Sequence, residues 1–194
     1  MLSFKSIREN IVDDLTGKLL IAVPQLPDEN FFRSVVLILR HDDEGALGVI
    51  LNRPSGVTIS QAWESLFDQT LDSREPIFIG GPVDGPLIGL SSRLATAEAG
   101  VIPGIYFSIN QEHLDELATK NQPPFRIFMG HSGWGPGQLE LEIEFGSWYI
   151  VEATAELIFE SDDSVWKDLL DQFGREVLSL TKVSSPGQVD PLMN

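Results

Sequence analysis

The chain contains no cysteine among its 194 residues. This absence excludes disulfides, thiolate nucleophiles and cysteine-ligated zinc or iron–sulfur clusters, and it is typical of proteins from a reducing compartment. No run of about 18 uncharged apolar residues is present, and acidic and polar residues interrupt the amino terminus where a signal peptide needs an apolar core. We therefore expect a cytoplasmic protein that does not span a membrane.

Basic residues are also scarce. Thirteen Lys and Arg residues stand against 29 Asp and Glu residues, which gives a formal net charge of −16. The basic residues are scattered, whereas affinity for nucleic acid needs several phosphate contacts from one surface. A strongly negative field also repels polyphosphates at long range. We therefore expect no direct DNA binding, and the sequence leaves the oligomeric state open.

Sequence motifs for metals and phosphates are missing as well. The three histidines, His41, His113 and His131, are far apart, and no Walker loop or G-x-G-x-x-G motif occurs. Gly80 and Gly81 could cradle an anion, but Pro82 removes one of the amides that would bind it, so we favour a structural turn. We expect neither a metal site nor a cofactor.

The hydrophobic content of 42% is enough for one sizeable core. We predict a single domain over residues 1–174, followed by a C-terminal extension over 175–194 whose end lacks an apolar pattern and is loosely ordered. Short apolar runs predict strands, with an antiparallel hairpin over 34–51 and a second pair of strands joined by a tight connection within 76–91. Further strands are predicted at 17–23, 104–109, 123–129 and 147–153.

Capping residues mark the predicted helices. Thr58 and Gln61 form a capping box before one helix, and Asn110 caps another that runs to Lys120. Ser161 is expected to cap a last helix that ends before Gly174. The connection at 53–56 is predicted to be a loop.

Two rules compete over residues 136–146. Apolar residues alternate from 139 to 145 as in a strand, while Pro136 and Gly146 bracket the segment as they would a helix. We predict a helix because Gln, Leu and Glu are good helix formers.

That segment belongs to the most unusual part of the sequence, residues 126–151, which hold five glycines, a proline and two tryptophans. Gly130-His131-Ser132 begins like the nucleophile elbow G-x-S-x-G, but Trp134 occupies the position of the final glycine. A hydrolase or transferase built on His131 and Ser132 is the alternative functional hypothesis. It lacks an evident base and orienting acid.

Three blocks in order resemble the AlgH/YqgE family of bacterial and plastid proteins: AVPQLPDENFFRSVVLILRHDDEGALGVILNRP, GGPV at 80–83, and GHSGWGPGQLELEIEFGSW. The resemblance implies an α+β fold whose bent mixed sheet is partly closed into a pseudo-barrel and flanked by helices. Some members carry a transcriptional regulator label through alginate control. His131 stands where the family pattern has another aromatic residue, usually Tyr.

Our main functional hypothesis is a noncatalytic binding or regulatory module for a small anionic or nucleotide-like ligand or a protein partner. The proposed pocket residues are Asn52, Arg53, His131, Trp134 and Gln138. Loop positions on a rigid scaffold commonly carry function, and Arg53 could grip a carboxylate or phosphate. The plainer alternative is that Asn52 closes a turn and Arg53 forms a surface ion pair.

We predict no appreciable affinity for duplex DNA, because a chain with a charge of −16 and no basic run must overcome repulsion before contact forms. A filter-binding titration at about 150 mM salt measures this. Submicromolar binding that weakens steeply with salt would contradict the prediction.

Overall fold

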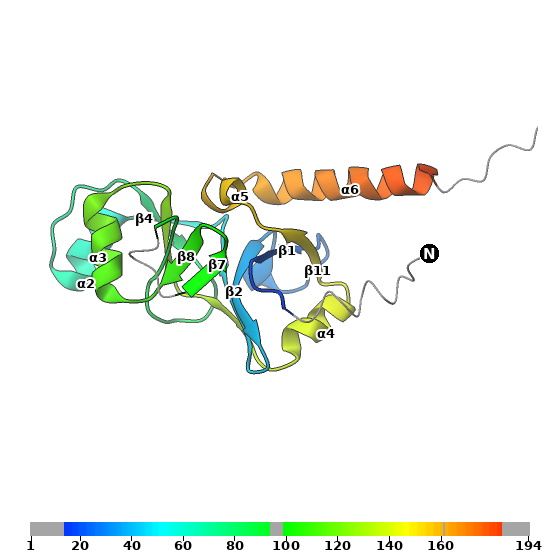
Figure 1. Ribbon diagram of the computed structural model, residues 1–194, viewed down its shortest axis with the longest axis horizontal. Helices are drawn as coiled ribbons and strands as arrows, with labels where there is room; N and C mark the ends of the chain where they lie inside the picture. The colour runs from blue at the N-terminus through cyan, green and yellow to red at the C-terminus, as the bar shows by residue number, and fades with distance from the viewer. Residues whose placement is uncertain (1–13, 94–98, 161, 184–194) are drawn as a thin grey trace, which may run out of the picture.

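The computed structural model describes residues 14–93, 99–160 and 162–183. Its strands form two sheets (Figure 1). Sheet A is antiparallel throughout and has the strand order β10-β3-β2-β1-β11. Its strands are β1 (Lys18–Ala22), β2 (Val35–Asp42), β3 (Gly45–Ile50), β10 (Ser132–Trp134) and β11 (Trp148–Glu152).

Sheet B has the order β4-β5-β9-β6-β8-β7 and is mixed, because β5 and β9 run parallel. Its strands are β4 (Pro54–Thr58), β5 (Pro76–Ile79), β6 (Ile88–Ser91), β7 (Ala99–Ile102), β8 (Ile105–Ser108) and β9 (Phe125–Met129). The predicted α+β class is confirmed. The single bent sheet is corrected to two sheets, and neither closes into a barrel within the described residues.

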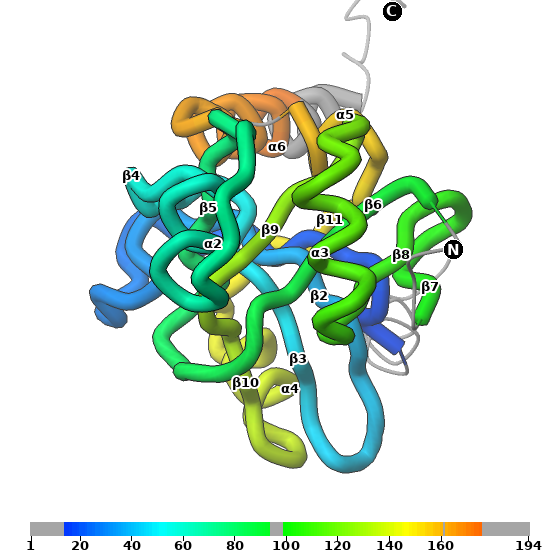
Figure 2. Tube along the Cα trace, turned by 90° about the vertical axis from the view of Figure 1, so that its left-hand side faces the viewer, coloured from blue at the N-terminus to red at the C-terminus, as the bar shows by residue number. Residues whose placement is uncertain are grey.

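The hairpin predicted over 34–51 is confirmed as β2 and β3. The second predicted pair is wrong, because β5 and β6 do not pair with each other. Strand β9 lies between them and aligns Ile127 with Ile77 on one side and with Gly89 on the other (Figure 2). The turn residues between β5 and β6 suggested a local hairpin. Instead, the buried apolar strand β9 lies between the two strands and forms main-chain hydrogen bonds with each of them.

The helix caps follow the sequence closely. Helix α2 (Ile59–Phe67) has the complete Thr58–Gln61 capping box, and α3 (Gln111–Lys120) has Asn110 as its N-cap. The contested segment forms helix α4 (Gln138–Glu144), so the helix prediction there is confirmed. A short 3-10 helix, η1 (Glu29–Phe31), precedes β2.

The C-terminal helices differ from the prediction. The sequence analysis missed α5 (Ala155–Phe159), and α6 (Val165–Val183) continues through Gly174 instead of ending before it. A glycine inside a helix costs only about 1 kcal/mol relative to alanine, which the rest of a long helix can offset. Ser161 lies outside the described residues, as do 184–194, and the single-domain assignment stays a prediction. Three short strands, β4, β7 and β10, were also missed.

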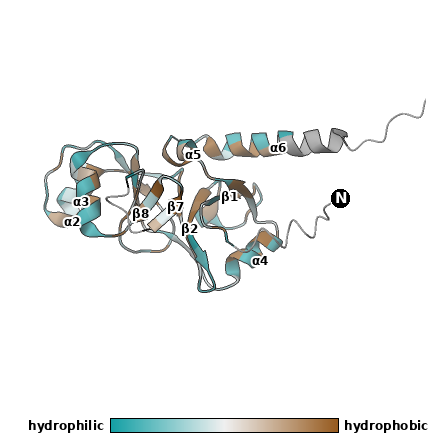
Figure 3. Cartoon of the chain, in the orientation of Figure 1, coloured by the Kyte–Doolittle hydropathy of each residue, from teal (hydrophilic) through white to brown (hydrophobic). Residues whose placement is uncertain are grey.

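The layers bury three apolar clusters. The first fills the space between sheet A, sheet B and the helices α5 and α6. The second lies on the other face of sheet A under α4, and the third lies between sheet B and the helices α2 and α3. Figure 3 shows hydrophobic strands such as β1 inside and a largely hydrophilic outer surface on α3. No helix in the described parts of the chain is long and apolar enough to cross a membrane.

Glycine-rich segments join the two sheets through main-chain hydrogen bonds. The Gly80 amide donates to Met129 O at 2.8 Å, and the Ile50 amide donates to Gly80 O at 2.8 Å. An isolated bridge between Val83 and His131 extends the contact. We call this junction, residues 80–83 against 129–132, the glycine seam. It connects the ends of β5 and β9 in sheet B to β3 and β10 in sheet A.

The glycine seam leaves no room for side chains. A Cβ atom on Gly80 would lie 2.3 Å from Gly130 O, and one on Gly81 would lie 2.3 Å from His131 C and O. Gly130 itself has a φ of +68°, which other residues rarely adopt. What approaches Gly130 is the backbone of residues 81–83, since a Cβ on Gly130 would lie 2.9 Å from Val83 O and 3.1 Å from Gly81 O.

We predict that Gly80→Ala lowers the free energy of unfolding by more than about 2 kcal/mol, because the new methyl group meets main chain that cannot move aside. Chemical denaturation measures the change. Gly174→Ala is the control, since nothing lies within 4 Å of its Cβ position, and it should stabilise α6 by up to about 1 kcal/mol. Equal stability of Gly80→Ala and the parent protein would contradict a structural role for the glycine seam.

Candidate functional site

Asn52 lies just beyond β3 and is used by the fold. Its Oδ1 accepts a hydrogen bond from the Val35 amide at 2.9 Å, and its Nδ2 donates to Arg33 O at 2.9 Å. The side chain therefore ties the chain after β3 to the start of β2. Asn52 still lines the edge of a surface cavity.

Arg53 is half-buried and forms main-chain contacts. Its guanidinium donates to Asn30 O at 2.7 Å and to Phe32 O at 3.4 Å, at the C-terminal end of η1. Burial lowers the pKa of Arg53 below its ordinary value. The plainer alternative for Arg53, an ion pair with a surface acid, is not among the described contacts, and the side chain instead binds main-chain carbonyls of a loop of its own chain.

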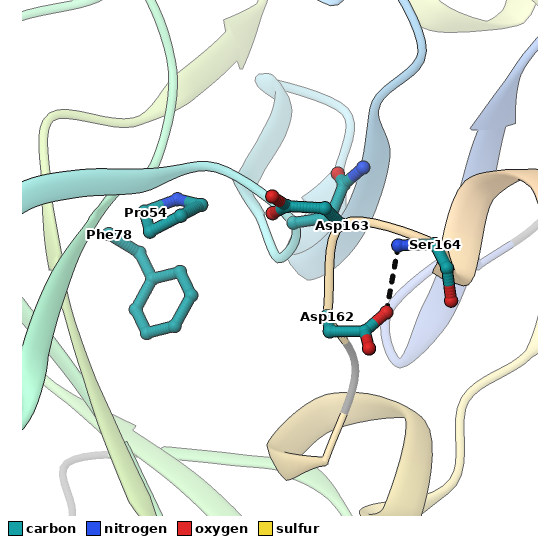
Figure 4. A pocket seen from close by; sticks show the side chains of 6 residues that line it. Pro54, Phe78, Asp162, Asp163 and Ser164 are labelled. Carbon is teal, nitrogen blue, oxygen red and sulfur yellow. Dashed lines mark hydrogen bonds between the residues drawn. The ribbon is translucent and has the colours of Figure 1, made fainter.

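The cavity next to Asn52 has a volume of about 460 Å³. Pro54 and Phe78 of sheet B form its apolar wall, and residues 162–164, between α5 and α6, form the facing wall. The Asp162 carboxylate accepts a hydrogen bond from the Ser164 amide at 2.7 Å (Figure 4). Hydrogen bonding by the Ser164 side chain, and after it by the Ser164 amide, lowers the pKa of Asp162 below its ordinary value. Figure 4 shows the Asp163 carboxylate directed across the cavity toward Pro54. The charged groups lining the cavity are carboxylates.

Arg126 packs against Phe78, which forms part of the apolar wall of this cavity. It is 8% exposed, and its guanidinium lies 4.4 Å from the centre of the Phe78 ring. It donates to Leu51 O at 2.8 Å and to Phe159 O at 3.1 Å, so it links the end of β3 to the end of α5. Burial lowers the pKa of Arg126 to about 10, which still leaves it charged at neutral pH. Arg126 therefore fixes both the Phe78 ring and the chain that leads to Asn52.

Ser132 and His131 are placed differently from the residues of a hydrolase. Ser132 is completely buried, and its hydroxyl donates to Gly80 O at 3.0 Å. His131 is half-buried, and a Cβ on Gly85 would lie 3.0 Å from its Nδ1, so the imidazole covers that glycine. A nucleophile must reach its substrate, and the Ser132 hydroxyl is instead part of the glycine seam.

Trp134 and Gln138 belong to a separate cluster. The Trp134 ring stacks on Phe31 at 5.7 Å and meets Trp148 edge-on at 6.2 Å. Glu142 of α4 accepts hydrogen bonds from Trp134 Nε1 at 3.0 Å, Trp148 Nε1 at 2.9 Å and Gln138 Nε2 at 3.0 Å. These contacts hold α4 against sheet A, so their main role is structural.

Of the five predicted pocket residues, only Asn52 lines the cavity. Arg53 and Trp134 both contact the region of η1, because Arg53 donates to Asn30 O and Phe32 O and Trp134 stacks on the Phe31 ring. The sequence analysis missed Phe78, Asp163 and Arg126. A lone arginine within the apolar strand FRIFM was a usable signal, since buried cations need a specific environment. Asp163 carries no comparable signal. Within the described ranges, no three metal-ligating side chains gather.

Comparison with known proteins supports the family resemblance that the three sequence blocks indicated. A model of the AlgH-like family matches residues 19–178. A UPF0301 protein from Streptomyces avermitilis is 41% identical, with 82% of this chain and 86% of that protein covered, and one from Myxococcus xanthus is 36% identical, with 83% and 92% covered. The solution structure of AlgH from Pseudomonas aeruginosa has a TM-score of 0.72 at 26% identity, covering 91% of this chain and 96% of that one. None of these names states a biochemical activity.

We predict that Glu142→Gln lowers the free energy of unfolding by about 1 to 3 kcal/mol, because an amide replaces a carboxylate that accepts three N–H groups. Urea denaturation followed by tryptophan fluorescence measures the loss. Glu144→Gln, on the exposed side of α4, is the matched control and should change stability by less than about 0.5 kcal/mol. Equal effects of the two variants would count against the role given to Glu142.

Proposed function

The chain belongs to the AlgH-like family, and we propose that it is a noncatalytic binding module for a basic side chain of a partner protein. The proposed binding site is the cavity between Phe78 and Asp163. The observation that carries this proposal is the combination of an apolar aromatic wall with facing carboxylates in a cavity of about 460 Å³. Sites of this size commonly combine apolar walls with a few polar groups that fix orientation.

The charge of the cavity supports a cationic group more than the anionic ligand expected from the sequence. Arg53, which was expected to grip an anion, donates its guanidinium hydrogen bonds to Asn30 and Phe32 carbonyls. The cavity itself presents Asp162 and Asp163. The net charge of −16 acts in the same direction, because it attracts basic partners at long range.

The two walls offer complementary contacts to lysine or arginine. The aliphatic stem of such a side chain can pack on Pro54 and Phe78 while its head reaches the Asp163 carboxylate. Arg126 holds the Phe78 ring from the other direction, so the apolar wall is in place before a ligand arrives. A module of this kind acts by holding its partner, and we place that action in the cytoplasm.

The alternative, a hydrolase or transferase using His131 and Ser132, has less support. The buried Ser132 hydroxyl is bound to Gly80 O, and no hydrogen bond joins it to His131 among the described contacts. Ser132→Ala is therefore expected to affect stability, by about 1 kcal/mol, and not a chemical step.

We predict that acetyl-arginine amide, used as a minimal probe, binds weakly at the cavity and shifts the amide resonances of residues around Asn52, Phe78 and Asp163. Asp163→Asn should weaken binding about fivefold, which corresponds to about 1 kcal/mol for a partly exposed charged contact. A two-dimensional ¹H–¹⁵N titration measures both effects.

Two controls define the outcome. Asp84→Asn makes the same charge change at an exposed loop position and should leave binding unaltered, and neutral acetyl-citrulline amide should bind more weakly than the arginine probe. Shifts spread evenly over the acidic surface, or equal weakening by Asp84→Asn and Asp163→Asn, would contradict the proposed site.

A further inference from the structure

A turn between η1 and β2 places Arg33 in an unfavourable backbone conformation. The Ser34 amide donates to Phe31 O at 3.1 Å, and Phe32 has a φ of −55° and a ψ of 120°. Arg33 follows with a φ of +54°. These values match a type II turn, whose third residue is normally glycine or asparagine, because most side chains crowd the backbone at positive φ. Arginine at this position therefore destabilises the turn relative to glycine.

Asn52 and Arg53, which follow β3, hold this turn in place. The Asn52 side chain bonds to the main chain of Arg33 and Val35. The Arg53 guanidinium donates to two carbonyls within residues 30–32. Four hydrogen bonds from two side chains thus fix the main chain on both sides of Arg33. Unfavourable backbone conformations persist where such contacts determine them, and they gather at active sites and ligand-binding sites.

Two aromatic rings flank the Arg33 guanidinium. Its central carbon lies 4.9 Å from the centre of the Phe32 ring and 5.4 Å from that of Trp166, at the start of α6. Trp166 is fixed by its Nε1, which donates to Ala22 O at 2.7 Å. Cation–π contacts attract a guanidinium electrostatically and supply no oxygen acceptor for its N–H groups. The two rings therefore position the Arg33 charge without using its donors.

The donors of Arg33 have no acceptor in the parts of the chain that the structure describes. Arg33 is exposed, and its side chain forms no hydrogen bond or ion pair with any described residue. Arg53 differs, because its guanidinium is bound to main-chain carbonyls. The chain has 29 acidic residues, yet none of those described pairs with this positioned cation. Arg33 is therefore available to an anionic group from another molecule.

We propose that Arg33 binds a carboxylate of a partner protein at this turn. The planar guanidinium presents paired N–H groups that match the two oxygens of a carboxylate. Phe32 lies beside the guanidinium and is 52% exposed, so the preferred carboxylate has an apolar group next to it. A carboxylate carries one negative charge and a phosphate group up to two. The net charge of −16 therefore opposes the phosphate more strongly.

The turn is a separate site from the cavity at Phe78 and Asp163, and this proposal does not rest on that one. The two are neighbours, because Asn52 lines the cavity and also binds Arg33 O. The cavity offers carboxylates to a cation, whereas the turn offers a cation to a carboxylate. Probes of opposite charge therefore test the two sites separately.

A two-dimensional ¹H–¹⁵N titration with acetyl-phenylalanine, whose carboxylate adjoins a phenyl group, tests the proposal at about 150 mM salt. We expect saturable shifts of the Phe32 and Arg33 amides and of the Trp166 indole N–H, while the indoles of the other tryptophans stay unchanged. Acetyl-phenylalanine amide, which lacks the carboxylate, should bind at least about fivefold more weakly. Acetyl-aspartyl-phenylalanine amide carries its carboxylate on a side chain, and its affinity relative to acetyl-phenylalanine distinguishes a side-chain source from a chain terminus.

Two variants separate binding from folding. Arg33→Gly suits the positive φ, so relief of the backbone should offset the lost ring contacts and keep the denaturation midpoint close to that of the parent protein. Its affinity for acetyl-phenylalanine should nevertheless fall at least about fivefold. Arg40→Gln removes an equal charge from another exposed position and should leave the affinity unaltered.

Several results would overturn the proposal. Equal affinities for the acid and its amide, or a titration of the parent protein that leaves Arg33 unshifted, would exclude a carboxylate site at this turn. The same conclusion would follow if Arg33→Gly kept the parent affinity, or if Arg33→Gly and Arg40→Gln weakened binding equally. Phenyl phosphate that binds more tightly than acetyl-phenylalanine would contradict the choice of a carboxylate. The titration of the parent protein needs no variant, so it decides the matter even if Arg33→Gly folds poorly.

Discussion

The arrangement of the whole molecule depends on one close approach of main chain to main chain. At the glycine seam, Gly80 and Gly81 lie so near to Gly130 and His131 that even a methyl group would overlap backbone atoms. Main-chain hydrogen bonds of Gly80, which follows β5, join it to Ile50 of β3 and to Met129 of β9. Because β3 and β5 are fixed together, the connection from Asn52 to Pro54 and the Phe78 ring have defined positions on one side of the molecule.

The residues that stand out in the sequence are not the residues that line the cavity. Glycines, tryptophans and Ser132 in residues 126–151 are conspicuous in the sequence, yet their contacts are internal to the fold. The cavity is instead formed by ordinary residue types brought together by topology: a phenylalanine from sheet B and aspartates that follow α5. Of the five glycines in this segment only Gly130 lies against crowded backbone, at the glycine seam, whereas nothing lies within 4 Å of a Cβ on Gly137 or Gly146. The cavity depends on what that seam positions.

Helix-capping residues in the sequence correctly predicted where two helices begin. The capping box at Thr58 and the N-cap at Asn110 are intrinsic to a few neighbouring residues, and both helices form as expected. Bracketing by Pro136 and Gly146 likewise identified α4. Strand pairing was predicted less well, because the insertion of β9 between β5 and β6 depends on residues about 40 positions away in sequence. The cavity has the same origin, since Phe78 and Asp163 meet only after both sheets are assembled. No periodicity or spacing in the sequence brings them together.

The central claim is that the glycine-rich blocks build the fold while the Phe78 and Asp163 cavity binds. A crystal structure of the protein grown with acetyl-arginine amide tests this most directly. Our account predicts guanidinium density between the Phe78 side chain and the Asp163 carboxylate, with the glycine seam unchanged. Density for the probe beside His131 and Trp134, with the cavity empty, would contradict it.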